Sequence, residues 1–227
     1  LINNNLGKIL IGTGFPVNNT FETDGPAGAI ALYTGIKKLG GDPVIVCDNP
    51  LLGLLESSFN TCEIQPNQNS ATKLLKKYQP SLIISIERPG KASDGHYYNM
   101  RGDNITPECA DFDSIVLHAD CPSICIGDGG NEVGMGNVSE ALKKLNINPS
   151  ITDCEELLVA DVSNWGAHGL LAILSRLTDQ DLLAEWDNEK VLAYLSKGGS
   201  VDGVTGKNTL TEDGMDSSIS QNIVNKL

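Results

Sequence analysis

Short apolar runs, each ending in polar residues, recur along the chain. The runs are apolar at nearly every position, which is typical of strands that are buried on both faces of a parallel sheet. Segments with helical signals lie between them. This alternation predicts an α/β fold with a doubly wound, mostly parallel sheet and helices on both of its faces. The expected strands are residues 8–12, 43–48, 81–87, 124–126 and 155–161, with a short strand at 62–64.

Helices are expected in the intervening segments. Asp24 is a suitable N-cap for the first helix, Pro26 suits its first turn, and Gly40 and Gly41 follow its last residues. The segment FDSIVLHA at 112–119 fits either a helix or a strand, because its periodicity does not distinguish them. The other helices are expected at residues 51–57, 70–78, 133–145, 167–177, 181–195 and 216–227.

Length and composition are those of an ordinary globular protein. The chain has 227 residues, of which 40% are hydrophobic and 20% charged. This length predicts a single domain over residues 1–227, and an alternative interpretation makes residues 180–227 a small helical appendage. Six cysteines occur without a CxxC pair, and most lie in apolar runs, which favours a reducing compartment.

Net charge excludes one class of function. The chain carries 16 basic and 29 acidic residues, a formal charge of −13. A nucleic-acid-binding protein needs a basic face, and no cluster of Lys or Arg occurs, so no nucleic-acid partner is expected. No apolar run approaches the roughly 20 residues of a membrane span, so no membrane partner is expected either. The pattern does not specify an oligomeric state.

The most informative segment is ICIGDGGNEVGMGN, residues 124–137. An apolar run ends here in a turn with three glycines in four positions, which permits backbone angles and close approaches that side chains forbid. The polar residues lie between the end of a strand and the expected start of a helix, where open α/β sheets place ligands. A helix cap needs fewer polar residues and glycines, so we interpret the turn as a site. Its candidate residues are Asp128, Gly129, Gly130, Asn131 and Glu132.

Polar side chains follow other expected strands in the same way, which predicts a site at the carboxyl edge of the sheet. Carboxylates that converge there repel each other unless a cation or ammonium group lies among them. The pattern requires no cofactor, but it suits a divalent cation such as Mg²⁺, Mn²⁺ or Ca²⁺, with Asp128, Asn131 and Glu132 as candidate ligands. The further candidates at this edge are Glu22, Thr23, Asp24, Gly25, Glu87, Ser163 and Asn164.

A polar stretch of about 20 residues, 87–108, follows the third expected strand. Loops of this length are usually functional or disordered. The histidine, tyrosines, methionine and arginine of this stretch argue against a flexible linker. We therefore expect an ordered active-site loop that presents Asp94, Tyr97, Tyr98 and Arg101.

Other kinds of catalysis lack their motifs. Three histidines occur, none in HExxH or HxH spacing, which argues against a zinc hydrolase. The sequence contains no GxSxG turn and no Cys/His spacing typical of a catalytic nucleophile and its base, so nothing supports nucleophilic catalysis. The chemistry is expected to rest on carboxylates, Arg101, tyrosine hydroxyls, helix N-termini and a metal ion where one is bound.

Five motifs in order carry a family resemblance: FETDGPAGAIAL, ERPGKASDGHYYNMRGDNI, IGDGGNEVGMGNV, VSNWGAHGL and SVDGVTGKN. Together they resemble the D-glutamate cyclase family, from about Gly12 to Leu227. The resemblance implies a lyase that reversibly cyclises D-glutamate to 5-oxo-D-proline with loss of water. It also implies a cytoplasmic location in a bacterium and the mitochondrial matrix in an animal. The run from Asp111 to Ile126 is shorter than the family pattern leads us to expect.

This chemistry suggests roles for the candidate residues. We predict that Glu87 or Asp94 takes the amine proton and that Arg101 clamps the α-carboxylate. Tyr97 or Tyr98 would donate to the leaving oxygen. Asp128 and Glu132 would orient the ammonium group or hold a divalent ion. The candidates for substrate binding are Glu22, Thr23, Asp24, Gly25, Tyr98, Gly129, Gly130, Asn131, Ser163 and Asn164.

Two other functions fit the same acidic site. A divalent-metal-dependent phosphatase or other hydrolase would release inorganic phosphate from simple esters and depend strictly on the metal. A metabolite-binding module without turnover would be stabilised by its ligand and form no product. In all three interpretations the partner is a small molecule.

Overall fold

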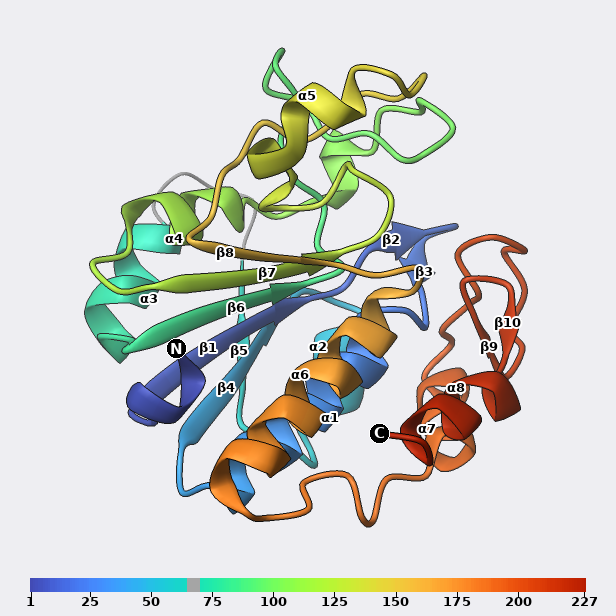
Figure 1. Ribbon diagram of the computed structural model, residues 1–227. Helices are drawn as coiled ribbons and strands as arrows, with labels where there is room; N and C mark the ends of the chain where they lie inside the picture. Colours follow the sequence, from blue (N-terminus) through green and yellow to red (C-terminus); the bar gives the residue numbers. More distant parts are fainter. Residues whose placement is uncertain (65–69) are drawn as a thin grey trace.

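The computed structural model describes residues 1–64 and 70–227, which form a twisted parallel sheet with helices on both sides (Figure 1). In this described part of the chain the sheet has six strands in the order β5-β4-β1-β6-β7-β8. The predicted doubly wound α/β fold is therefore confirmed. The strands are β1 (Lys8–Thr13), β4 (Asp42–Cys47), β5 (Thr61–Glu63), β6 (Leu82–Ile86), β7 (Ser123–Gly127) and β8 (Glu156–Val159).

The strand order reverses between β1 and β6. The chain builds outward from β1 through β4 to β5, then returns to β6 and continues through β7 to β8. Doubly wound sheets with this order bind ligands in the crevice outside the carboxyl ends of the strands, where the order reverses. β1 ends at Thr13, and Glu87 directly follows the last residue of β6. The topology therefore places Glu87 at this crevice.

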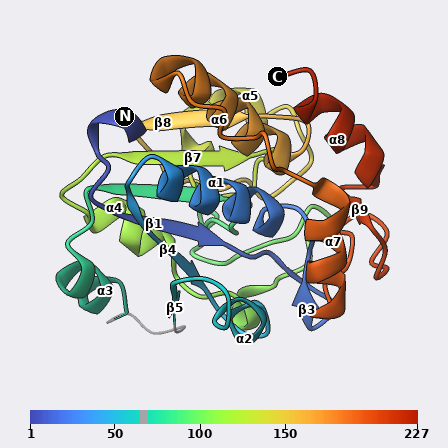
Figure 2. The ribbon, with the colours of Figure 1, turned by 90° about the horizontal axis from the view of Figure 1, so that it is seen from below.

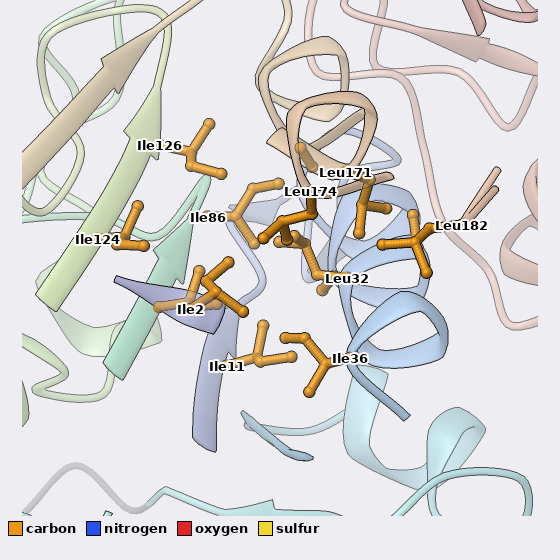
Figure 3. Packing of buried hydrophobic residues seen from close by; sticks show 14 of the residues in the cluster. Ile2, Ile11, Leu32, Ile36, Ile86, Ile124, Ile126, Leu171, Leu174 and Leu182 are labelled. Carbon is orange, nitrogen blue, oxygen red and sulfur yellow. The ribbon is translucent and has the colours of Figure 1, made fainter. Parts of the chain in front are cut away.

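Burial on both faces explains why β1 is apolar at successive positions. Ile9 and Ile11 contribute to a hydrophobic cluster with α1 (Pro26–Lys38) and α6 (Ser163–Thr178), whereas Leu10 belongs to a cluster on the opposite face. Each such side chain stabilises the fold by about 1.5–3 kcal/mol when fully buried. Figure 3 shows the first cluster, in which strands and helices contribute Ile11, Ile86, Ile124, Ile126, Leu32, Ile36, Leu171 and Leu174.

Helices cover both faces of the sheet (Figure 2). α1 and α6 pack side by side on one face, and α3 (Ser70–Tyr78) and α4 (Asp113–His118) pack on the other. None of the described helices has the length and apolar character needed to cross a bilayer. The shorter elements are α2 (Leu51–Leu55), α5 (Ser139–Leu142), η1 (Ile2–Asn4), η2 (Thr106–Glu108), η3 (Met135–Val138) and the strands β2 (Pro16–Val17) and β3 (Thr20–Phe21).

The segment 180–227 packs against the sheet and its helices. Its elements are α7 (Asn188–Lys197), β9 (Thr211–Glu212), β10 (Met215–Asp216) and α8 (Ser217–Val224). α7 contributes Leu192 and Leu195 to a hydrophobic cluster that also contains Ile45 of β4. α8 lies against α6. The segment thus shares buried surface with the rest of the chain.

The predicted helix at 133–145 is wrong in its first half. A 3-10 turn, η3, precedes a single short helical segment, α5. The backbone N–H of Val133 donates to the Arg88 carbonyl oxygen, and that of Gly136 donates to the Thr152 carbonyl oxygen. These long-range bonds occupy donors at the start of the expected helix, and Gly134 has a positive φ of 99°. Tertiary contacts therefore override the local helical pattern.

The predicted helix at 181–195 is also wrong at its start, because α7 begins only at Asn188. The side chain of Asp187 accepts a hydrogen bond from the Lys190 backbone and caps α7. The apolar residues Leu182 and Leu183 still reach the core, from a turn rather than a helix. The undecided segment 112–119 is a helix, α4, and α6 begins at Ser163, four residues earlier than expected.

Candidate active site

A pocket of about 520 Å³ opens at the carboxyl edge of the sheet, where the strand order reverses. Apolar side chains from three loops contribute to its wall, including Phe15, Met100 and Val204. Among the described residues, Arg101 is the only basic side chain that lines the pocket. The acidic side chains that line it are Glu22, Asp24, Glu87, Asp103, Glu108, Asp128, Glu132 and Asp213. The pocket is therefore strongly negative.

Three of these carboxylates form a tight group. Asp24, Glu87 and Asp128 each have an oxygen within 4.8 Å of the others. Asp24 precedes α1, Glu87 follows β6, and Asp128 follows β7. The sheet therefore joins residues that lie more than 100 positions apart in the chain. We refer to Asp24, Glu87 and Asp128 below as the carboxylate triad.

Asp24 is not the N-cap of α1, as the sequence predicted, because Gly25 holds that position; Asp24 instead caps a helix that lies far away in the sequence. Its carboxylate accepts hydrogen bonds from the backbone N–H groups of Ser163 and Asn164, both at 2.8 Å. These donors are in the first turn of α6, where the helix dipole favours a negative charge. Burial and the nearby Glu212 outweigh these hydrogen bonds and raise the pKa of Asp24 to about 7. Asp24 is therefore both a structural link and a member of the triad.

Asp128 and Glu87 are also shifted toward the protonated form. Burial, together with repulsion from Asp24, raises the pKa of Asp128 to about 10. Burial, followed by repulsion from Asp128, raises the pKa of Glu87 well above its usual value. The Ser163 hydroxyl donates to Glu87 at 2.6 Å. When no cation lies among them, at least one of the three carboxyl groups of the triad is therefore protonated.

The backbone around Glu87 is unusual. Glu87 has a positive φ of 44°, which costs energy for a residue with a side chain. Gly25 packs closely against it, since a Cβ atom on Gly25 would lie 2.5 Å from the Glu87 Cβ. Gly25 itself has a φ of 88°. The predicted site residue Gly25 therefore makes space for Glu87.

Glu22 lies two residues before Asp24 in the sequence and lines the same pocket. It is only 9% exposed, and no described residue donates a hydrogen bond to its carboxyl group. Burial, followed by repulsion from Asp24 and Asp213, raises its pKa well above the usual value. Asp213 was not predicted from the sequence, because no apolar run typical of a buried strand precedes it.

The turn after β7 is held by its own glutamate. The Glu132 carboxylate accepts hydrogen bonds from the backbone N–H groups of Gly129 at 2.9 Å and Gly130 at 2.8 Å. The side-chain nitrogen of Asn131 donates to the Tyr98 carbonyl oxygen at 2.7 Å. The Asn131 side-chain oxygen is buried and has no partner among the described residues. Glu132 therefore shapes the turn that presents Asp128 and Asn131.

The side-chain amide of Asn164 and the hydroxyl of Thr23 form hydrogen bonds inside the protein. The Asn164 side-chain oxygen accepts from the backbone N–H groups of Gly25 and Gly28, and its nitrogen donates to Glu212 at 2.5 Å. The Thr23 hydroxyl donates to the Thr211 carbonyl oxygen at 2.7 Å. Both residues hold the walls of the site together.

Glu212 and Asn188 are parts of this network that sequence analysis missed. Glu212 is fully buried and accepts from Asn164 and from the Asn188 side chain at 2.7 Å. The hydrogen bonds connect the C-terminal segment to the start of α6. No local signal marks either residue, because each is recognisable only by its distant partners.

Arg101 lies at the entrance of the pocket. Its guanidinium donates to the Val204 carbonyl oxygen at 3.3 Å, and its side chain is exposed. Among the described residues no carboxylate forms an ion pair with it. Arg101 is thus available to an anionic ligand at the entrance.

Three predicted loop residues lie apart from the carboxylate triad and do not line the pocket. Asp94 is exposed and accepts a hydrogen bond from the Tyr98 hydroxyl at 2.6 Å. Tyr97 is buried, and its hydroxyl donates to Asp113 at 2.9 Å. Burial, followed by repulsion from Asp113, raises the pKa of Tyr97. The predicted 87–108 loop is ordered, but it contributes Arg101 rather than its tyrosines to the pocket.

The chain is thus a doubly wound α/β protein with a buried carboxylate site where the strand order of its sheet reverses. The whole chain, residues 1–227, matches the model of a family described as "D-glutamate cyclase-like, C-terminal". The chain belongs to this D-glutamate cyclase-like family, and the resemblance predicted from five motifs is confirmed.

One curated relative is the human protein named "D-glutamate cyclase, mitochondrial". It is 32% identical over an alignment of 199 residues, and the match covers 74% of this chain and 32% of the relative. The chain therefore spans about a third of that relative's length. Among solved structures, an exopolyphosphatase-related protein from Bacteroides fragilis aligns with a TM-score of 0.50 and 10% identity, covering 99% of this chain and 54% of that one. At this identity the likeness shows the fold alone.

Proposed function

We propose that this chain catalyses the reversible cyclisation of D-glutamate to 5-oxo-D-proline. Family membership and the human relative's name support this reaction. The observation that carries the proposal is one pocket with an unpartnered carboxyl group, Glu22, and an unpaired guanidinium, Arg101, among its described residues. A glutamate molecule carries groups of both complementary charges. For an animal chain we propose the mitochondrial matrix as its location, and for a bacterial chain the cytoplasm.

The reaction needs proton transfer and close positioning. The α-ammonium nitrogen loses two protons in total and bonds to the γ-carboxyl carbon. One γ-carboxyl oxygen gains two protons and leaves as water. Because nucleophile and electrophile belong to one molecule, a site that folds the substrate into its ring conformation gains most of its effect from proximity. The remaining requirement is a group that accepts and returns protons at the nitrogen and the leaving oxygen.

We assign this proton transfer to Glu22. It is buried in the pocket wall, and Asp213 beside it adds negative charge that attracts an ammonium group. Arg101 at the entrance binds the α-carboxylate with its planar guanidinium. This arrangement directs the γ-carboxyl group toward the triad. Contact between these anions is favourable only where a proton or a cation lies between them.

Chiral chromatography with mass detection tests the reaction. Purified protein is incubated with D-glutamate, L-glutamate and both 5-oxoproline enantiomers, and we expect interconversion of the D pair only. Parallel reactions with a simple phosphate ester measure inorganic phosphate for the hydrolase alternative. Thermal unfolding with each compound measures binding without turnover. Phosphate release, or stabilisation without product, would replace the cyclase proposal.

Substitution of Arg101 tests its role in substrate binding. We expect Arg101→Gln to lower kcat/KM by about 10–100-fold, because a charge-assisted hydrogen bond is worth about 1.5–3 kcal/mol. Arg101 is exposed, so the variant should fold normally. The matched control is Arg176→Gln, an exposed arginine on α6 outside the pocket, which should leave turnover unchanged. Equal activity of the two variants would remove Arg101 from the site.

A further inference from the structure

We propose that the carboxylate triad binds one hard divalent cation of the Mg²⁺, Mn²⁺ and Ca²⁺ class. The triad replaces the ligand set predicted from the sequence, because Glu132 is engaged by Gly129 and Gly130. Asp128 is shared by both sets. The proposal deepens the proposed cyclase function and rests on it only for the role given to the ion.

The spacing of the triad suits one ion. Oxygen atoms from Asp24, Glu87 and Asp128 all lie within 4.8 Å of one another. Hard divalent ions bind oxygens at about 2.0–2.6 Å, so oxygens on opposite sides of one ion are about 4–5 Å apart. A single ion at the centre of the triad can therefore contact all three carboxylates. The three residues are anchored by a helix terminus and two strand ends, which fixes their backbone positions.

The triad lacks a protein cation. Arg88 is adjacent to Glu87, but its guanidinium forms a bidentate ion pair with Asp48 at 3.0 Å. Arg101 contacts the Val204 carbonyl oxygen at the entrance. No other basic side chain among the described residues lines the pocket. The negative charge of the triad therefore needs a cation from solution, or else protons.

One other buried oxygen atom independently indicates a ligand in this pocket. The side-chain oxygen of Asn131 has no hydrogen-bond partner among the described residues, and Asn131 is 2% exposed. Asn131 lines the pocket that contains the triad. Buried acceptors without donors are rare in folded proteins and indicate an absent partner.

The donor set selects the class of ion. All the candidate donors are carboxylate or amide oxygens, which favour Mg²⁺, Mn²⁺ and Ca²⁺ over softer ions. Neither histidine nor cysteine is among the described residues that line the pocket. In the cyclase reaction the ion would neutralise the triad and attract the γ-carboxylate, where it would polarise the carbon–oxygen bond. The proposed role explains how an acidic pocket accepts an anionic substrate.

Mn²⁺ binding to the full chain tests this site without reference to activity. The protein is treated with EDTA, dialysed, and titrated with Mn²⁺ by calorimetry, and free Mn²⁺ is counted by electron paramagnetic resonance. We expect one ion per chain, with Mg²⁺ and Ca²⁺ as competitors. Binding of no ion at millimolar concentration, or of several equivalent ions, would overturn the proposal.

Asp128→Asn is the variant of choice, because Asp128 is half-buried and asparagine has nearly the same size without the negative charge. We expect Mn²⁺ affinity to fall by about 100-fold or more, since loss of even an outer partner of a metal ligand costs about 10–100-fold. The control is Glu108→Gln, an exposed acid of the same pocket, which should change affinity less than about threefold. Equal losses of Mn²⁺ affinity in the two variants would show that the ion responds only to the overall negative charge of the pocket, and would overturn the proposed site.

Thermal unfolding separates loss of the ion from loss of the fold. Metal-free Asp128→Asn should unfold at or above the wild-type temperature, because the substitution removes one repelling carboxyl group. Its Tm should no longer rise with Mn²⁺, whereas that of Glu108→Gln should still rise. Mn²⁺ binding without any D-glutamate turnover would leave the metal site intact and refute the cyclase. Full turnover in EDTA would refute the role of the ion and leave the cyclase intact.

Discussion

At the scale of single residues, burial determines which side chains titrate near neutral pH. His168 is fully buried in α6, with its ring 5.0 Å from that of Trp186. Neither ring nitrogen has a partner among the described residues. Burial lowers the pKa of His168 from 6.5 to about 4, so the folded protein holds this histidine neutral. The histidine is a packing residue, outside the pocket.

This histidine should make stability depend on pH. Because its folded-state pKa is below its unfolded-state pKa, the unfolded chain binds the extra proton between about pH 6.5 and pH 4. The free energy of unfolding should therefore be lost progressively as the pH falls through this range. At about 1.4 kcal/mol per pKa unit, the loss approaches about 3 kcal/mol at pH 4.

Urea unfolding between pH 7 and pH 4 measures this effect as a difference between proteins. In His168→Leu the pH-dependent contribution of the histidine should vanish. The difference in the free energy of unfolding between wild type and variant should therefore change by about 3 kcal/mol between pH 7 and pH 4. The carboxyl groups contribute equally to both proteins and cancel. The control is His118→Leu, an exposed histidine on α4. A gap that is constant with pH would contradict the prediction.

At the scale of elements, the site is built where the starts of α1 and α6 meet. Asp24, from the loop before α1, caps α6, and Asn164, from the first turn of α6, binds the backbone of Gly25 and Gly28. The two helices thus satisfy each other's terminal N–H groups. The sequence suggested Asp24 as the N-cap of the first helix, but it could not show that Asp24 caps α6 instead.

Asn164→Ala should therefore destabilise the fold. The substitution leaves the Gly28 backbone N–H without its partner in a buried region, and it removes one of two partners from the Gly25 backbone N–H and from Glu212. At about 1–3 kcal/mol for the unsatisfied buried group and about 1 kcal/mol for each further lost hydrogen bond, we expect a loss of about 3–5 kcal/mol in the free energy of unfolding. Urea denaturation followed by circular dichroism measures it.

Asn137 provides a matched control for this substitution. Its side chain also bridges backbone groups, both on Cys154 at 2.9 Å, but it is exposed. Water can replace these bonds, so Asn137→Ala should cost about 1 kcal/mol or less. A similar small loss in Asn164→Ala would show that the helix starts are held by other contacts.

At the scale of the whole molecule, the C-terminal segment completes both a hydrophobic cluster and the site network. Leu192 of α7 packs with Ile45 of β4, and Glu212 connects Asn164 to Asn188. These contacts predict that residues 180–227 unfold together with the sheet.

The two tryptophans of the chain allow a direct test. In a Trp165→Phe background the fluorescence of Trp186 reports on the C-terminal segment, and far-UV circular dichroism reports on the whole fold. We expect their urea transitions to coincide. Leu192→Ala should move both midpoints together, with a loss of about 2–5 kcal/mol. A fluorescence transition at lower urea would show that the segment is an independent appendage.

Local pattern was sufficient to predict the strands of the six-stranded sheet, and the reason is physical. A strand that is buried on both faces must be apolar at successive positions, so β1, β4, β6 and β7 are visible in the sequence itself. The helices at 133–145 and 181–195 were overestimated, because backbone bonds to distant segments and a late cap decided where those helices begin. The same pattern places acidic residues after the strands, so an acidic carboxyl edge was predictable.

Which of the acids meet depends on tertiary contacts. Local spacing along the chain is enough to specify the fold class, the family motifs and an acidic edge of the sheet. The grouping of Asp24, Glu87 and Asp128 depends on the order of the strands and the angles of the loops. Tertiary structure also decides that Glu132 binds the backbone of its own turn and that Asp213, from near the C-terminal end of the sequence, lines the pocket. Contacts between residues so distant in the sequence leave no local signal, because their partners are chosen by packing.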